Sequence, residues 1–239
     1  MGLVDEGSGP VVVALHGLPG SVRDFRWLAP ALTDTHRVIR VELPGFGRSP
    51  VGGTGYDLNA RGAFVAGLIE ELGLEEVVVL GHSMGGPVAV SAAVQSERIR
   101  AVALLASVGP DVHRAIRRQP GVRAACYTLH SSLVARLGMP LLKRSFASMG
   151  FRNVSESDIL QACFVLSRFR FRTHRANLAA LRKPTLVAWA QDDALVEEAI
   201  SDKLYWAAPA GPRVRFATGG HNIQATRATE LAEALKAWV

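Results

Sequence analysis

One serine in this chain stands where its hydroxyl can act as a nucleophile. Ser83 lies in the run Gly81-His82-Ser83-Met84-Gly85-Gly86, between an apolar run that ends at Leu80 and an apolar segment that begins at Pro87. That order predicts a strand, a sharp turn and a helix, with the serine held at the apex in a strained backbone conformation. A side chain at either flanking glycine would collide with the neighbouring strand or helix, which explains why both positions lack a Cβ.

A serine hydroxyl needs a base that takes its proton, and that base needs an acid that orients it. The chain carries candidates for both roles: Asp192 and Asp193 follow the apolar run 184–190, and His221 follows the run 213–217. The order serine, aspartate, histidine along the chain is that of one known class of catalytic triad. Functional groups of open parallel sheets gather at the carboxyl ends of the strands, so we expect these side chains to converge there.

The elements that must position these residues alternate between short apolar runs and segments of helical spacing. Strands are expected at 11–15, 37–41, 77–80, 101–106, 184–190 and 213–217, and helices at 25–32, 58–72, after Ser83 and at 230–238. This alternation predicts an α/β fold with a mostly parallel, doubly wound sheet and right-handed crossovers.

Between residues 111 and 182 the spacing is helical without a convincing strand. A segment of that length between two strands of one sheet is far longer than an ordinary loop. We therefore expect a core built from 1–110 and 183–239 and a helical cap, or lid, inserted over 111–182. Seven apolar residues of the insertion are candidates for lining an acyl pocket: Met139, Leu141, Leu142, Phe146, Met149, Phe151 and Phe164.

The chain resembles the serine-nucleophile members of the α/β-hydrolase fold family, of the esterase and lipase type with a helical cap. The resemblance rests on the glycine-flanked Ser83 turn and on the order of its partners, and it covers nearly the whole length. It implies Ser83 as nucleophile and His221 as base. The family's loop puts the acid three residues after the position of Ala190, which selects Asp193 over Asp192.

The resemblance also implies an oxyanion hole. His16-Gly17 after the first apolar run looks like the family's oxyanion loop, with the backbone N–H groups of Leu18 and Met84 as donors. Such donors oppose the charge that develops on a substrate carbonyl oxygen. Pro19 has no N–H, so Leu18 is the candidate donor at that point in the loop.

The beginning of the chain departs from the family pattern. The family's sheet starts with two further strands before the one that ends at His16, and here only residues 3–7 could supply a remnant. We expect these N-terminal strands to be shortened or missing. If they are absent, the strand at 37–41 lies at an open edge, and a homodimer through that edge is our hypothesis.

These features predict hydrolysis of a carboxylic ester of small to medium apolar size through an acyl-enzyme, with no metal or organic cofactor. A serine at the turn argues against epoxide hydrolases and haloalkane dehalogenases, which use aspartate there. Carbon–carbon bond hydrolases of the diketo-acid type share the triad and a helical lid, and the run Arg168-Phe169-Arg170-Phe171-Arg172 could capture their anionic substrates. Low-turnover ligand receptors on the same fold, some with an intact triad, are the other alternative.

Composition narrows the partners to a small-molecule substrate. The chain has 239 residues, 49% of them hydrophobic, and a net charge of +6 that is spread without a Lys/Arg block, which favours a solvated basic surface over a nucleic-acid site. No apolar run approaches the roughly 20 residues that span a bilayer, and the first residues lack a signal-peptide pattern. Two cysteines, Cys126 and Cys163, fit free buried thiols and a cytoplasmic location.

Overall fold

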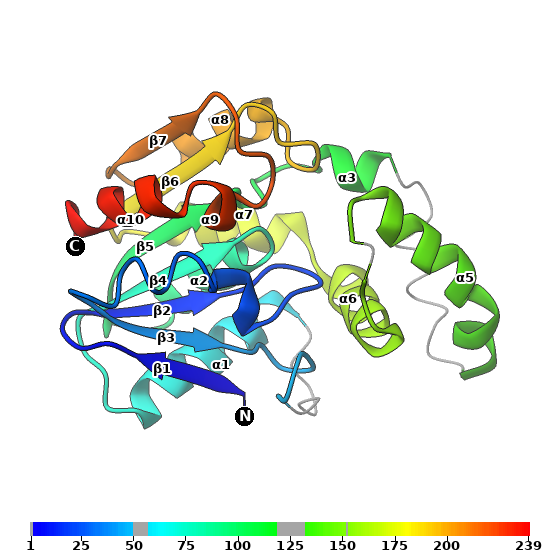
Figure 1. Ribbon diagram of the computed structural model, residues 1–239, viewed down its shortest axis with the longest axis horizontal. Coiled ribbons are helices and arrows are strands. Elements are labelled where there is room, and N and C mark those ends of the chain that lie inside the picture. The colour runs from blue at the N-terminus through cyan, green and yellow to red at the C-terminus, as the bar shows by residue number, and fades with distance from the viewer. Residues whose placement is uncertain (1, 50–56, 119–131, 152) are drawn as a thin grey trace.

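The computed structural model describes residues 2–49, 57–118, 132–151 and 153–239, with the backbone alone at 132–136. Within those residues seven strands form one sheet: β1 (Leu3–Glu6), β2 (Val11–Leu15), β3 (Arg37–Val41), β4 (Val77–His82), β5 (Ile99–Leu105), β6 (Thr185–Ala190) and β7 (Arg213–Phe216). Their spatial order is β1-β3-β2-β4-β5-β6-β7, and β1 alone runs antiparallel to its neighbour (Figure 1). The predicted α/β class and mostly parallel sheet are confirmed.

The winding of the chain reverses between β2 and β4. From β2 the chain moves outward to β3, and it then returns to place β4 on the other side of β2. Ligand sites of open α/β sheets form at such a switch point, outside the carboxyl ends of the strands. The turn with Ser83 follows β4 and the loop 16–18 follows β2, so both lie there.

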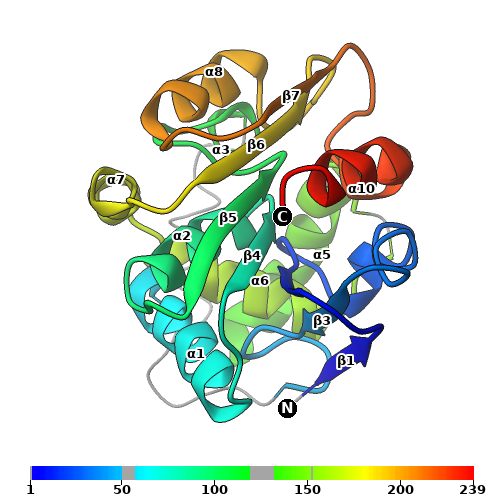
Figure 2. The same cartoon turned by 90° about the vertical axis from the view of Figure 1, so that its left-hand side faces the viewer.

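Helices cover both faces of the sheet and the region beyond its carboxyl edge. In chain order the described helices are η1 (Val22–Phe25), α1 (Leu58–Glu71), α2 (Gly85–Ala93), α3 (Arg114–Arg117), α5 (Ser132–Ser148), α6 (Glu156–Arg168), α7 (Phe171–Ala180), α8 (Glu198–Ala207), α9 (Ile223–Thr226) and α10 (Ala228–Lys236). Helices α1, α2, α7 and α8 lie on one face and α10 on the other (Figure 2). Two covered faces explain why the strands read as continuous apolar runs.

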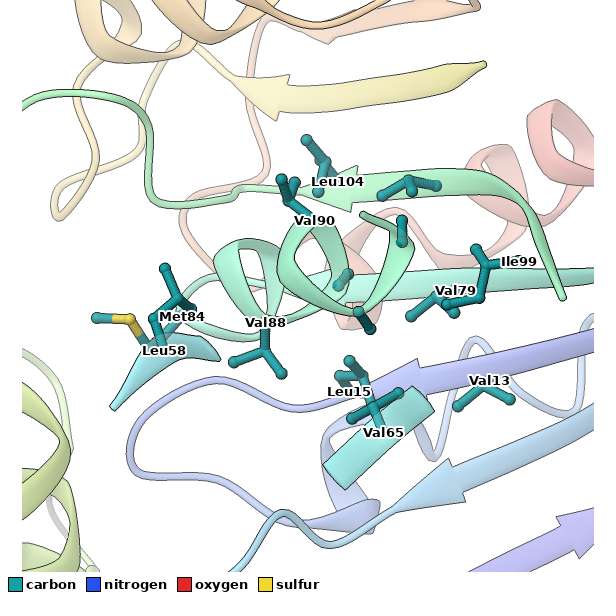
Figure 3. Packing of buried hydrophobic residues seen from close by; sticks show 14 of the residues in the cluster. Val13, Leu15, Leu58, Val65, Val79, Met84, Val88, Val90, Ile99 and Leu104 are labelled. Carbon is teal, nitrogen blue, oxygen red and sulfur yellow. The ribbon is translucent and has the colours of Figure 1, made fainter. Parts of the chain in front are cut away.

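The core has one apolar cluster on each face. In β2, Val13 and Leu15 belong to the cluster under α1 and α2, whereas Val12 and Ala14 belong to the cluster under η1 and α10. Figure 3 shows the first cluster, in which Val88 of α2 lies near Leu15. This alternation follows from the period of two along a strand. The two clusters hold the sheet from both faces beneath the turn that carries Ser83.

One predicted helix is wrong. The segment 25–32 is not helical: a 3₁₀-helix over Val22–Phe25 is followed by hydrogen-bonded turns. A capping box starts η1 early, because Ser21 accepts from the backbone of Arg23 while its own N–H donates to Asp24. Pro30 then removes a backbone donor where a continuing helix would need one. The helix predicted at 58–72 is confirmed as α1.

The expected N-terminal shortening takes the form of one four-residue strand. Residues Leu3–Glu6 pair antiparallel with β3, from Leu3 opposite Val41 to Glu6 opposite Val38. The outer side of β3 is therefore covered. The condition for an open edge at 37–41, and with it the homodimer hypothesis at that edge, does not hold.

The segment between β5 and β6 forms two groups of helices. Helices α3, α5 and α6 lie beyond the carboxyl ends of the parallel strands (Figure 1). A small buried cluster joins α5 to α6: Met139, Leu142, Phe146, Ile159, Ala162 and Cys163. Helix α7 instead packs on α1 and α2, and its Phe171 and Leu178 belong to the main core. Outside the described residues lie 119–131 of the expected cap, with Cys126, and residue 152.

Among the helices that the structure describes, none has the length and the apolar character that a membrane span requires.

Candidate active site

The turn after β4 holds Ser83 in a left-handed backbone conformation, with φ of 53°. The backbone N–H of Ser83 donates to the Leu105 carbonyl at 3.0 Å, which ties the turn to β5. A Cβ on Gly81 would lie 2.4 Å from the Gly85 carbonyl oxygen, and one on Gly85 would lie 2.3 Å from the Leu15 carbonyl oxygen. Glycine is thus sterically required at both positions, as the sequence predicted, and the strain at Ser83 is held by its surroundings.

The structure brings Ser83, His221 and Asp193 together in one hydrogen-bonded chain. His221 Nε2 lies 2.8 Å from Ser83 Oγ, and His221 Nδ1 lies 2.8 Å from Asp193 Oδ2. The three side chains come from the loops after β4, β6 and β7, at one edge of the sheet. This is the geometry in which a histidine can take a proton from a serine while a carboxylate orients the ring.

Asp193 is held as a buried carboxylate. Asp193 is only 2% exposed. Its Oδ1 accepts from the backbone N–H groups of Leu195 at 2.8 Å and Val196 at 2.9 Å. Burial alone would raise the pKa of Asp193, but the hydrogen bond and charge of His221, together with these two donors, lower it below its usual value. The ionised carboxylate keeps the proton of His221 on Nδ1 and leaves Nε2 free to accept from Ser83.

The adjacent Asp192 has a different partner. Its side chain is exposed, and Oδ1 accepts from the backbone N–H of Gly220 at 2.7 Å. Asp192 therefore braces the loop just before His221 without touching the imidazole. Of the two aspartates, Asp193 is the one whose carboxylate lies within hydrogen-bond distance of the imidazole.

Two further buried histidines shape the loops around Ser83. His16 Nδ1 donates to the Gly17 carbonyl at 2.8 Å and its Nε2 accepts from the Leu43 N–H at 3.1 Å, so both ring nitrogens are engaged in the neutral form. His82 Nε2 donates to the carbonyl of His221 at 2.9 Å. Burial lowers the pKa of His16 to about 4 and that of His82 to about 3. Sequence analysis did not identify this link, because no local pattern marks a contact across 139 residues.

The backbone donors expected for an oxyanion hole lie beside the serine. Within the described residues, the N–H groups of Leu18 and Met84 donate no hydrogen bond to another residue. Both residues line the same cavity as Ser83 and His221. Two free donors at this position leave room for an oxygen atom that carries negative charge.

Two cavities meet at Ser83 and His221. The first, here called the apolar cavity, is lined by Leu18, Ser83, Met84, Val108, His113, Ala115, Ile116, Phe146, Met149, Phe151, Leu166, Leu195, Val196 and His221. The second, here called the polar cavity, is lined by Gly17, Leu18, Pro19, Asp24, Arg26, His82, Ser83, Phe151, His221, Asn222, Gln224 and Ala225.

The helical segment contributes fewer lining residues than the sequence suggested. Phe146, Met149 and Phe151 line the apolar cavity, whereas Leu141 is 71% exposed. In the run 168–172, none of the arginines lines either cavity among the described residues. Leu195 was missed, although its place two residues after Asp193 was a usable signal. Across the described ranges, no group of three or more His, Cys, Asp or Glu side chains could hold a metal ion.

Comparisons with known proteins agree with this fold. A family profile described as alpha/beta hydrolase fold matches residues 10–127. The dihydrolipoyllysine-residue acetyltransferase component of the acetoin cleaving system of Cupriavidus necator is 30% identical over 241 residues, which cover 96% of this chain and 63% of that protein. This chain thus spans less than two thirds of the length of that relative.

Two hydrolases are also similar. The 2-hydroxy-6-oxononadienedioate/2-hydroxy-6-oxononatrienedioate hydrolase of Cupriavidus pinatubonensis is 28% identical over 247 residues, covering 92% of this chain and 83% of that protein. An esterase from Exiguobacterium antarcticum superposes with a TM-score of 0.79 at 21% identity, covering 98% of this chain and 93% of that structure. The chain belongs to the α/β-hydrolase fold family.

Proposed function

We propose that this protein hydrolyses carboxylic esters through an acyl-enzyme, with Ser83 as nucleophile, His221 as base and Asp193 as the orienting acid. One observation carries the proposal: the hydrogen-bonded chain from Ser83 Oγ through both nitrogens of His221 to Asp193 opens onto an apolar cavity. A serine activated in this way attacks the carbonyl carbon of an ester, and the apolar cavity accepts the acyl group of a small to medium ester.

In acylation, Ser83 Oγ forms a bond to the carbonyl carbon as its proton passes to His221 Nε2. The carbonyl oxygen takes the negative charge and accepts from the N–H groups of Leu18 and Met84. The tetrahedral species collapses as the C–O bond to the alcohol breaks, and the Nε2 proton goes to the departing oxygen. Asp193 stabilises the positive charge that His221 carries between these two transfers.

In deacylation, water takes the place of the alcohol. A water oxygen attacks the acyl carbon while its proton passes to His221 Nε2, and the new oxyanion again accepts from the two backbone donors. The bond to Ser83 Oγ breaks, the proton returns to that oxygen, and the carboxylic acid leaves. Every proton in this cycle is moved by His221, so no metal or cofactor is needed.

We propose that the helical segment acts as the cap of this site. Three helices or their ends supply walls of the apolar cavity: Ile116 from α3, Phe146 from α5 and Leu166 from α6. Helix α7 packs with the core, which favours a cap that ends before Phe171 over one that extends through 182. The expected start of the cap at 111 is kept, and the proposed core then comprises 1–110 and 171–239 in place of 183–239.

A second candidate is a carbon–carbon bond hydrolase of the diketo-acid type. The relative from Cupriavidus pinatubonensis, whose name denotes a hydrolase of such a diacid, favours it. An anionic substrate needs a cation in the site, and the arginines of 168–172 that suggested this role do not line either cavity. Arg26 in the polar cavity is the cation that this reaction would have to use.

The test is hydrolysis of p-nitrophenyl esters, from acetate to long-chain acids, by the wild type and by Ser83→Ala. We expect many turnovers that disappear in the variant, with a rate optimum at short to medium chains. Equal rates in both proteins would contradict the serine mechanism. Slow, near-stoichiometric release over the whole series would favour a ligand receptor, and turnover confined to a vinylogous diketo acid would favour the second candidate.

A further inference from the structure

The two cavities approach the reacting atoms from two sides. Ser83 and His221 line both cavities, and so do Leu18 and Phe151. A substrate carbonyl carbon at Ser83 Oγ therefore carries two branches, the acyl chain and the alcohol, with one cavity available to each.

The walls of the two cavities differ in chemistry. Besides Ser83 and His221, the one polar side chain described in the wall of the apolar cavity is His113, whose Nδ1 donates to the Leu195 carbonyl at 3.1 Å and whose Nε2 is buried with no hydrogen-bond partner in the described chain. The polar cavity carries Asp24, Arg26 and Gln224, and its Arg26 is exposed at the surface. A cavity with several polar partners and an exposed end holds water more readily than one with mainly apolar walls.

The route by which water reaches His221 decides which cavity holds the acyl chain and which holds the alcohol. Deacylation repeats acylation in reverse with water in place of the alcohol, so the attacking water occupies the site that the leaving oxygen vacated. That water must reach His221 Nε2 while the acyl group still fills its own cavity. The polar cavity supplies that water, because it joins His221 to exposed Arg26 and carries the polar side chains of Asp24 and Gln224.

We infer that the polar cavity is the leaving-group site, that the apolar cavity holds the acyl group, and that the preferred alcohol carries a second hydroxyl. The inference rests on the ester hydrolysis proposed above and adds the class of alcohol.

The second hydroxyl follows from the acceptors in the polar cavity. Gln224 is 3% exposed; its Nε2 faces Asn222 Oδ1 at 3.5 Å, and its Oε1 is buried with no hydrogen-bond partner in the described chain. Buried oxygens of this kind are rare unless a ligand or water supplies a donor. Asp24 adds a carboxylate, and burial raises its pKa to about 6. Two hydrogen-bond acceptors in the wall of the polar cavity favour an alcohol with a second hydroxyl that can donate to them.

A matched pair of esters tests the class of alcohol. Propyl butanoate and 2-hydroxyethyl butanoate share the acyl group and differ by a terminal methyl against a hydroxyl. We expect kcat/KM to be about tenfold or more higher for the hydroxyethyl ester, because a site built for a hydroxyl loses that hydrogen bond with the analogue. Both rates come from one protein sample, so partial misfolding of a variant does not change their ratio.

Three variants locate the effect. Gln224→Met, close in size but without the amide, should bring the ratio near one. Gln191→Met is the control, because Gln191 is exposed and lines neither cavity, and it should keep the wild-type ratio. Met149→Ala enlarges the apolar cavity and should shift the preferred acyl length without changing the alcohol ratio.

A partition experiment separates this inference from the proposed reaction. The acyl-enzyme formed from p-nitrophenyl butanoate is divided between water and equal amounts of 1-propanol and ethylene glycol. The alcohol gives its proton to His221 and forms the new ester as the bond to Ser83 breaks. We expect about tenfold or more hydroxyethyl ester over propyl ester, and near equality in Gln224→Met.

Equal partition in the wild type, or a preference that Gln224→Met leaves intact, would overturn the inference while Ser83-dependent release of p-nitrophenol still supports the reaction. A Met149→Ala variant that changes the alcohol ratio would reverse the cavity assignment and overturn it as well. Release of p-nitrophenol that Ser83→Ala does not abolish would remove the proposed reaction itself.

Discussion

Asp192 and Asp193 are neighbours in the chain with different partners, so they provide a matched pair of substitutions. In Asp193→Asn the amide cannot hold His221 with its proton on Nδ1, and we expect kcat to fall on the order of 10³–10⁴-fold, as for the same change in other serine triads. Asp192→Asn keeps an oxygen for the Gly220 N–H and should change kcat by less than about twofold. The measurement is kcat for p-nitrophenyl butanoate; equal losses in both variants would contradict the assignment of the acid.

His82 is a positioning residue, because its Nε2 donates to the carbonyl of His221 at 2.9 Å and so acts through that residue. His82→Leu leaves that carbonyl without its donor, and we expect kcat to fall about tenfold with KM nearly unchanged, since misplaced groups lose rate more than binding. His82→Gln can place its amide N–H near the same point and should restore most of the rate. A leucine variant that raises KM alone, or a glutamine variant no better than leucine, would rule out positioning.

The sequence predicted that Ser83, His221 and the pair Asp192-Asp193 lie together, because each comes shortly after an apolar run and the carboxyl ends of parallel strands share one edge. The family resemblance then selected Asp193 over Asp192. Sequence analysis did not reach the link from His82 to His221 or the buried oxygen of Gln224. Those depend on how the loop after β7 packs on the turn after β4, and nothing in the local pattern encodes that distance.

Among the elements, helices α5 and α6 depend on a small cluster of their own. Leu142 is 4% exposed within it, whereas its neighbour Leu141 points away from the cluster and is 71% exposed. Leu142→Ala should lower the free energy of unfolding by about 2–4 kcal/mol, and Leu141→Ala should stay within about 0.5 kcal/mol of the wild type. Urea unfolding of both variants is the measurement. Similar losses would mean that α5 packs differently from the cluster described here.

Sequence reasoning misjudged one element because of local chain effects and another because of tertiary packing. The segment 25–32 has apolar residues at helical spacing, but an early capping box and Pro30 convert it to turns. Helix α7 has helical spacing like α5 and α6, and only its packing on α1 and α2 separates it from them. Spacing identifies a helix and its apolar side, but it does not identify the surface against which that side packs.

Over the whole molecule, three buried histidines couple stability to pH. Burial lowers the pKa of His16 and of His174 to about 4 and that of His82 to about 3, against an ordinary value of 6.5. Between these values the folded protein holds the rings neutral while the unfolded chain binds protons, so unfolding takes up as many as three protons. The free energy of unfolding therefore falls as pH drops below about 6.5.

Asp24 acts with the opposite sign. Burial raises its pKa to about 6 from 3.8, so between these values the folded state holds a proton that unfolding releases, and its contribution is lost as pH rises above 6. Near pH 5 the net uptake on unfolding from these four groups is about two protons, which gives a slope of about 2–3 kcal/mol per pH unit. Burial also lowers the pKa of His113, which adds to the uptake. Urea unfolding between pH 4.5 and 7 measures this slope, and a flat profile would contradict the buried neutral histidines.

A single substitution isolates one of these protons. His174 Nε2 donates to the Val108 carbonyl at 3.2 Å. A glutamine amide can supply the same donor. His174→Gln should flatten the slope near pH 5 by about 1.4 kcal/mol per pH unit, because one proton is no longer taken up on unfolding. An unchanged slope would mean that His174 is protonated in the folded state at that pH, and that its charge is compensated inside the core.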